Sequence, residues 1–194
     1  MSQLVIFYDW MTKALGKDAA AHFIATTDPA KGELRKMAAD LGWRTLSVPP
    51  NVGGRFSVLS AVGLFPAAMA GIDIRQLLSG AAFMDRRCEA RRLEGNPSFV
   101  YAALQYALYR KGANVSVLMP YSWALADLAD WYRQLWAESL GKRTDTAGKV
   151  INVGPTPVKA LGATDQHSQL QLYVEGPYDR SITFMEVKNF KRSL

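Results

Sequence analysis

Residues 113–141 read ANVSVLMPYSWALADLADWYRQLWAESLG, an apolar run followed by a long amphipathic segment. The run at 113–119 predicts a buried strand, and the segment at 122–140 predicts a helix that ends at Gly141. The same alternation continues on both sides. Further extended segments are expected at 22–27, 44–48, 150–158 and 181–187, and helices at 4–15, 31–41, 58–70, 73–93, 97–111 and 164–175. This order predicts an α/β fold with a doubly wound, mostly parallel sheet and helices on both faces.

Length and composition predict one compact domain over residues 1–194. The apolar share of 49% is enough for a core, and the charged share of 21% argues against disorder. The net charge of +6 suits phosphorylated small molecules. Because the basic residues are dispersed and no nucleic-acid motif accompanies them, we expect no nucleic-acid partner.

Several features predict a cytoplasmic location without membrane contact. The single cysteine, Cys88, cannot form an intramolecular disulfide, which fits a reducing compartment. The N-terminus lacks the pattern of a signal peptide, and no stretch approaches the roughly 18 apolar residues of a membrane span.

The segment 52–60, VGGRFSVLS, places an arginine on a two-glycine turn between a strand and an apolar helix. Glycine permits positive φ and close approach of the backbone to a ligand, so Gly53 and Gly54 predict such a turn. The guanidinium group of Arg55 can pair there with a phosphate or a developing oxyanion. The sequence also places Pro66 inside the following helix, where a kink or break is expected.

The helix at 122–140 carries a candidate general base near its C-terminus. Helical spacing puts four side chains on one edge, those of Asp127, Trp131, Gln134 and Glu138. The helix dipole and partial burial beside Trp131 would both disfavour a charged carboxyl group at Glu138, as a general base near neutral pH requires. The alternative is an ordinary surface glutamate paired with Lys142 four residues later.

The segment 162–169, GATDQHSQ, carries a candidate proton shuttle. Glycine followed by Thr and Asp indicates a helix start, so His167 is expected in the first turn, where the positive helix end favours a neutral imidazole. The alternative is a histidine bonded to local backbone. Two histidines and one cysteine at these separations predict no metal site, and no nucleotide or nucleophile motif is present, so no cofactor is expected.

Three segments, in the family's own order, resemble the glucose-6-phosphate isomerase family, and a fourth, at 26–43, resembles the flanking βα unit. They are TTDPAKGELRKMAADLGW (26–43), VGGRFSVLSAVGLFPAAMAGID (52–73), QLWAESLGK (134–142) and GATDQHSQLQLYVEGP (162–177). The resemblance covers nearly the whole chain. It implies the second of two flavodoxin-like sugar-isomerase (SIS) domains, so the single domain at 1–194 is expected to be of SIS type. The implied reaction is aldose–ketose isomerisation of glucose 6-phosphate and fructose 6-phosphate through a cis-enediolate.

The resemblance also implies roles for particular residues. Glu138 matches the base that moves a proton between C1 and C2, and Arg55 matches the arginine that stabilises the developing negative charge. His167 matches the residue that assists ring opening from the neighbouring subunit, which implies a homodimeric parent enzyme. Gln134 and Gly54 are expected to contact the substrate. Neither a metal nor a redox cofactor is required.

Two parts of the family pattern are missing. The Ser/Thr-rich phosphate loop and the C-terminal helix with its active-site lysine are absent, so the chain resembles a second domain truncated at both ends. We therefore expect little or no activity from the chain alone. The alternative function is a non-catalytic sugar-phosphate-binding SIS module, against which the retention of Glu138 and His167 argues.

Overall fold

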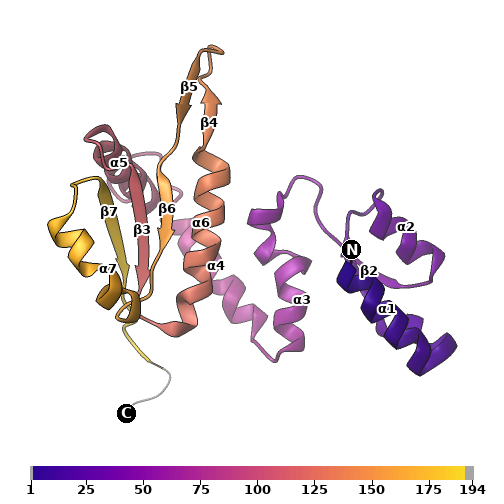
Figure 1. The fold of residues 1–194 in the computed structure, drawn as a ribbon. Coiled ribbons are helices and arrows are strands. Elements are labelled where there is room, and N and C mark those ends of the chain that lie inside the picture. Colours follow the sequence, from indigo (N-terminus) through magenta and orange to yellow (C-terminus); the bar gives the residue numbers. More distant parts are fainter. Residues whose placement is uncertain (1, 191–194) are drawn as a thin grey trace. The chain divides into compact units, whose positions relative to one another are not determined.

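A computed structural model describes residues 2–190, which are arranged in two compact units, Met1–Ala82 and Phe83–Leu194 (Figure 1). The single domain expected over 1–194 remains a prediction. None of the helices within 2–190 is long and apolar enough to cross a membrane.

The N-terminal unit is built around a short parallel sheet. Its elements are α1 (Ser2–Leu15), the 3₁₀ helix η1 (Gly16–His22), β1 (Ile24–Thr27), α2 (Glu33–Asp40), β2 (Arg44–Ser47), the 3₁₀ helix η2 (Gly54–Leu59) and α3 (Ala61–Met69). Strands β1 and β2 pair in parallel. Trp43 is the centre of the core: it stacks on Phe23 with ring centroids 4.5 Å apart, beside Ala25, Ala38 and Tyr8. Helix α4 (Ile74–Arg87) runs through the boundary between the units.

The C-terminal unit contains a three-stranded parallel sheet in the order β6-β3-β7 (Figure 1). Its elements are α5 (Pro97–Arg110), β3 (Val115–Pro120), the 3₁₀ helix η3 (Trp123–Leu125), α6 (Ala126–Leu140), β4 (Lys142–Thr144), β5 (Val150–Val153), β6 (Thr156–Lys159), α7 (Thr164–Glu175) and β7 (Arg180–Met185). Strands β4 and β5 form an antiparallel hairpin. The predicted α/β class with parallel strands is therefore confirmed.

Helices cover both faces of this sheet. Side chains of the buried strand β3 alternate between the two faces, so each face packs against a helix. Leu118 packs with Ala129 and Tyr132 of α6. Val117 and Met119 point the other way, into a cluster that includes Tyr173 of α7. The unit thus has three layers, with α6 and α7 on opposite faces, as the doubly wound prediction requires.

Some element boundaries differ from those expected. The helix expected at 73–93 ends at Arg87, and the one expected at 122–140 begins with the separate turn η3. Helix α3 continues through Pro66, so no break occurs there. The extended segment expected at 150–158 is two strands, β5 and β6. Strand β4, which pairs with β5 in the exposed hairpin, was not expected.

Asn96 explains why α4 stops early. Its side chain is 1% exposed, and its Nδ2 donates hydrogen bonds to the carbonyl oxygens of Cys88 at 2.7 Å and Ala90 at 2.8 Å. Its Oδ1 accepts from the backbone N–H groups of Ser98 and Phe99, which caps α5. One buried amide therefore holds the connection after α4 and starts the next helix.

Replacing Asn96 should destabilise the protein more than loss of an ordinary cap. We expect Asn96→Ala to lower the free energy of unfolding by about 2–4 kcal/mol, because both the cap and the bonds to two carbonyl groups are lost. Asn96→Asp keeps the capping oxygen but turns a second buried oxygen towards the Cys88 and Ala90 carbonyl groups, so it should not restore the lost stability. Urea unfolding followed by circular dichroism measures both variants. Equal stability of Asn96→Ala and the wild type would contradict this role.

A polar network lies in the layer between the sheet and helices α5 and α6. The Tyr132 hydroxyl is 2.7 Å from Ser116 Oγ, and Ser116 donates to Gln105 Oε1, which also accepts from Ser181. Tyr132 is 7% exposed, and this burial raises its pKa because the phenolate would be poorly solvated.

The network makes the effect of Tyr132→Phe depend on pH. Near pH 7 we expect the variant to be less stable by about 1–2 kcal/mol, because Ser116 loses a buried partner. Above a pH of about 10 the wild type loses stability faster, because Tyr132 ionises in the unfolded chain but stays protonated when folded. The difference between the two proteins should therefore shrink as pH rises, which urea titrations at several pH values measure. A constant difference would contradict the raised pKa.

Candidate functional site

Arg55 lies on a 3₁₀ turn that serine side chains hold closed. The buried Ser57 donates from Oγ to the Gly54 carbonyl at 2.6 Å, and Ser60 donates likewise to the Ser57 carbonyl at 2.6 Å. Ser60 also accepts from the N–H of Val62, which caps α3. The serines of VGGRFSVLS thus shape the loop that presents the arginine.

The two glycines before Arg55 do not use the positive φ that glycine permits. Gly53 has φ −68°, and Gly54 is not among the positive-φ glycines. A Cβ added to Gly54 would meet no atom within 4 Å, so the backbone there is open to an approaching group. The Arg55 guanidinium carbon lies 4.9 Å from the centroid of the Phe56 ring, a cation–π contact that helps to orient it.

Glu138 lies in the last turn of α6, in contact with Gln134. The Gln134 Nε2 donates to Glu138 Oε1 at 3.0 Å, so the predicted shared helix edge is confirmed. Both side chains are exposed, and Trp131 is itself 37% exposed. The expected partial burial of Glu138 is therefore wrong. The helix ends at Gly141, whose N–H donates to the Ala137 carbonyl.

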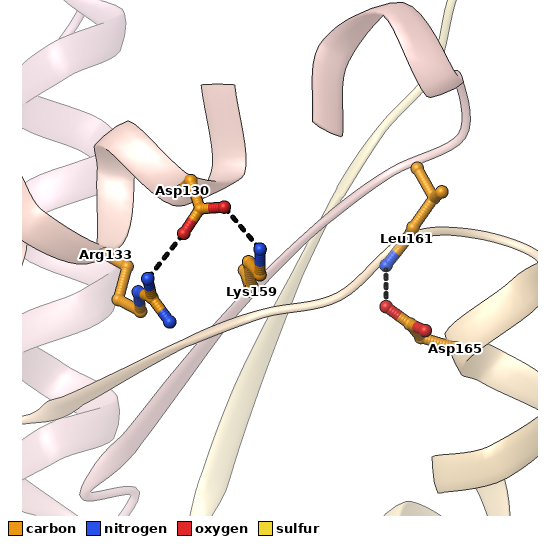
Figure 2. A network of polar contacts seen from close by, with 5 residues as sticks. All are labelled: Asp130, Arg133, Lys159, Leu161 and Asp165. Atoms are coloured by element: carbon orange, nitrogen blue, oxygen red, sulfur yellow. Dashed lines mark hydrogen bonds and ion pairs between the residues drawn. The ribbon is translucent and has the colours of Figure 1, made fainter. Parts of the chain in front are cut away.

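His167 lies in the first turn of α7, as predicted. Its N–H donates to the Ala163 carbonyl at 3.2 Å, and its side chain is exposed. Ala163 occupies the N-cap and makes no side-chain cap. Instead Asp165 reaches back, and its Oδ2 accepts from the N–H of Leu161 at 2.8 Å (Figure 2).

Helix α6 is also tied to strand β6 by an ion-pair cluster (Figure 2). The Asp130 carboxylate binds Lys159 and also Arg133, the latter at 2.6 Å. The hydrogen bond from Lys159 lowers the pKa of Asp130. Sequence reasoning missed this cluster because Lys159 is 29 residues from Asp130 and the signal exists only in the folded unit.

The structure brings together part of the predicted site. Gln134 and Glu138 are in contact, and His167 is on another helix of the same unit. Arg55 and Gly54 belong to η2 of the N-terminal unit. Across residues 2–190 no group of three or more His, Cys, Asp and Glu side chains could hold a metal ion.

Sequence reasoning also missed Tyr121, the residue that follows β3. Its hydroxyl donates to Gln166 Oε1 at 2.6 Å, next to His167. A signal was available, because ligands of parallel sheets bind beyond the carboxyl ends of strands, and Tyr121 comes directly after a strongly apolar run.

Comparison with known proteins gives a consistent result. A sequence model of phosphoglucose isomerase matches residues 4–188. The glucose-6-phosphate isomerase of Carboxydothermus hydrogenoformans is 52% identical over 191 residues, which cover 98% of this chain and 41% of the relative. That of Rubrobacter xylanophilus is 46% identical over 196 residues, covering 100% of this chain and 43% of the relative. This chain thus spans less than half the length of these curated relatives.

Solved structures agree with the sequence matches. A hypothetical protein from Thermus thermophilus superposes with a TM-score of 0.87 at 39% identity, over 98% of this chain and 46% of that one. A glucose-6-phosphate isomerase from Chlamydia trachomatis superposes with a TM-score of 0.77 at 24% identity, over 92% of this chain and 35% of that one, and supports the fold alone. With a family model matched along almost its whole length and relatives near 50% identity, the chain belongs to the phosphoglucose isomerase family.

Proposed function

We propose that the chain works as part of a glucose-6-phosphate isomerase, which interconverts glucose 6-phosphate and fructose 6-phosphate. The observation that carries the proposal is the Gln134–Glu138 contact at the end of α6, in a chain that matches the family over residues 4–188. An oriented carboxylate is what abstraction of a proton beside a carbonyl requires.

In the proposed mechanism Glu138 moves one proton within the open-chain sugar. Its carboxylate takes the proton from C2 of the aldose, which leaves a cis-enediolate, and returns that proton to C1. The hydroxyl proton of O2 passes to O1 as the carbonyl forms at C2. No atom is gained or lost. The Gln134 amide, by donating to one carboxylate oxygen, restricts rotation of the group so that it meets the substrate in one orientation.

The other residues supply charge and a proton relay. Arg55 would stabilise the enediolate oxygens, since a guanidinium group pairs well with a developing oxyanion. Gly54 leaves the adjacent backbone open to substrate. His167, in the first turn of α7, would pass a proton to the ring oxygen as the cyclic sugar opens.

We also propose a homodimeric, cytoplasmic parent enzyme in which His167 serves the neighbouring subunit. This arrangement follows the family resemblance, and the single cysteine fits a reducing compartment. The chain's net charge of +6 favours the binding of a negatively charged sugar phosphate.

The chain alone should have little activity. It spans 41% of the Carboxydothermus relative, and positioning of the substrate is expected to need parts of the enzyme outside that span. We expect a coupled assay to give turnover at least about 1,000-fold below that of a chimera in which this chain replaces the homologous region of the relative. Turnover by the isolated chain close to that of the chimera would overturn this expectation.

Glu138→Gln should abolish most of the activity of that chimera. Glutamine keeps the shape of the side chain but cannot accept the proton, so we expect kcat to fall by about 10²–10⁴-fold with little change in KM. Both parameters come from the coupled assay in the direction of glucose 6-phosphate formation.

Glu175→Gln is the matched control for this variant. Glu175 ends α7 and also accepts from a glutamine four residues earlier, Gln171, but it has no proposed role. Its activity should equal that of the unmodified chimera. Near-normal kcat for Glu138→Gln would rule out Glu138 as the base.

A further inference from the structure

Tyr121 stands where the central strand of the C-terminal sheet ends. It follows β3, and its N–H donates to the Met185 carbonyl at the end of β7, at 2.9 Å. Its ring packs with the buried cluster of Val117, Met119 and Ala160. The residue is thus held by the sheet at the edge where parallel sheets bind ligands.

From this place Tyr121 contacts the start of α7 at two points. Its hydroxyl donates to Gln166 Oε1 at 2.6 Å. Its ring lies against the backbone of Gly162, because a Cβ added to that glycine would be 2.6 Å from ring carbons Cε1 and Cζ. The Gly162 N–H also donates to the Pro120 carbonyl, at 3.0 Å.

One contact lies just before the turn that carries His167, and the other lies within that turn. Gly162 precedes α7, and Gln166 is the residue before His167. Asp165 closes this turn on itself by accepting from Leu161, whereas Tyr121 links it to the sheet. A shift of Tyr121 would therefore move the backbone from which the imidazole extends.

We propose that Tyr121 is a positioning residue for His167, fixing the first turn of α7 against the end of β3. The role of His167 in ring opening rests on the proposed function, whereas the placement of its imidazole by Tyr121 does not. Positioning matters because small displacements of a catalytic group lower rates steeply.

The first test is nuclear magnetic resonance of the isolated chain. The chain has only two histidines, His22 and His167, so its imidazole signals can be assigned with one substitution at each. In Tyr121→Phe, which keeps the ring but loses the hydroxyl, we expect the His167 imidazole signals to shift and those of His22 to stay. Gly162→Ala, which pushes on the ring from the other side, should shift them too.

Tyr101→Phe is the matched control for this measurement. Tyr101 is also a half-buried tyrosine, but it belongs to α5 and its hydroxyl lies 3.2 Å from Thr183 Oγ1 of β7, in the polar layer between the sheet and helices α5 and α6. Its loss should leave the His167 signals in place. Coincident His167 signals in Tyr121→Phe and the wild type would overturn the positioning role.

The second test uses the active chimera and a double-mutant cycle. We expect Tyr121→Phe to lower kcat by about 3- to 10-fold with KM nearly unchanged, as loss of one hydrogen bond allows. In a His167→Ala background the same change should have no further effect, because Tyr121 acts through the missing imidazole. Equal effects in both backgrounds would show a general structural role and overturn the proposal.

These two tests separate the two ideas. If Glu138→Gln leaves the chimera active, the proposed function fails, yet the resonance measurement still decides whether Tyr121 places His167. If the His167 signals do not move while Glu138→Gln is inactive, the positioning role fails and the proposed function stands.

Discussion

The burial of β3 on both faces is the constraint on which the C-terminal unit depends. Ser116 and Leu118 point to the layer of α5 and α6, while Val117 and Met119 point to that of α7. Because successive side chains alternate, a shift of one residue in register would exchange the two layers and expose apolar groups. Glu138 and His167 extend from helices on opposite layers, so their placement follows from the packing of this one strand.

Periodicity predicted the main elements because each depends on local sequence. Helix α7 begins and ends at the predicted residues, 164 and 175, and the Gln134–Glu138 edge follows from helical spacing alone. The end of α4 could not be predicted in this way, because it depends on the Asn96 side chain eight residues after Cys88. Strand β4, and with it the hairpin to β5, was missed because its three residues are exposed and carry no alternating pattern.

The candidate site shows the same division between local and tertiary information. Residue types and spacing indicated Glu138, His167 and Arg55, but the surroundings of each depend on neighbours that are remote in sequence. Glu138 is exposed, although helix geometry beside Trp131 suggested burial. The turn after Gly53 and Gly54 is held by hydrogen bonds from Ser57 to the Gly54 carbonyl and from Ser60 to the Ser57 carbonyl, which the glycine pair itself does not reveal.

An exposed carboxylate changes what the proposed mechanism has to explain. Because Glu138 is exposed, the proposed mechanism requires its rate advantage to come from orientation or from groups that close over it with the substrate. Orientation is what this chain provides: the Gln134 amide restricts the carboxylate, and Tyr121 restrains the turn that bears His167. In the proposed enzyme, exclusion of water would fall to the bound sugar phosphate and to segments like those of the relatives that this chain does not span. We therefore infer that, in the proposed enzyme, residues 83–190 supply groups that are aligned for proton transfer before the substrate binds.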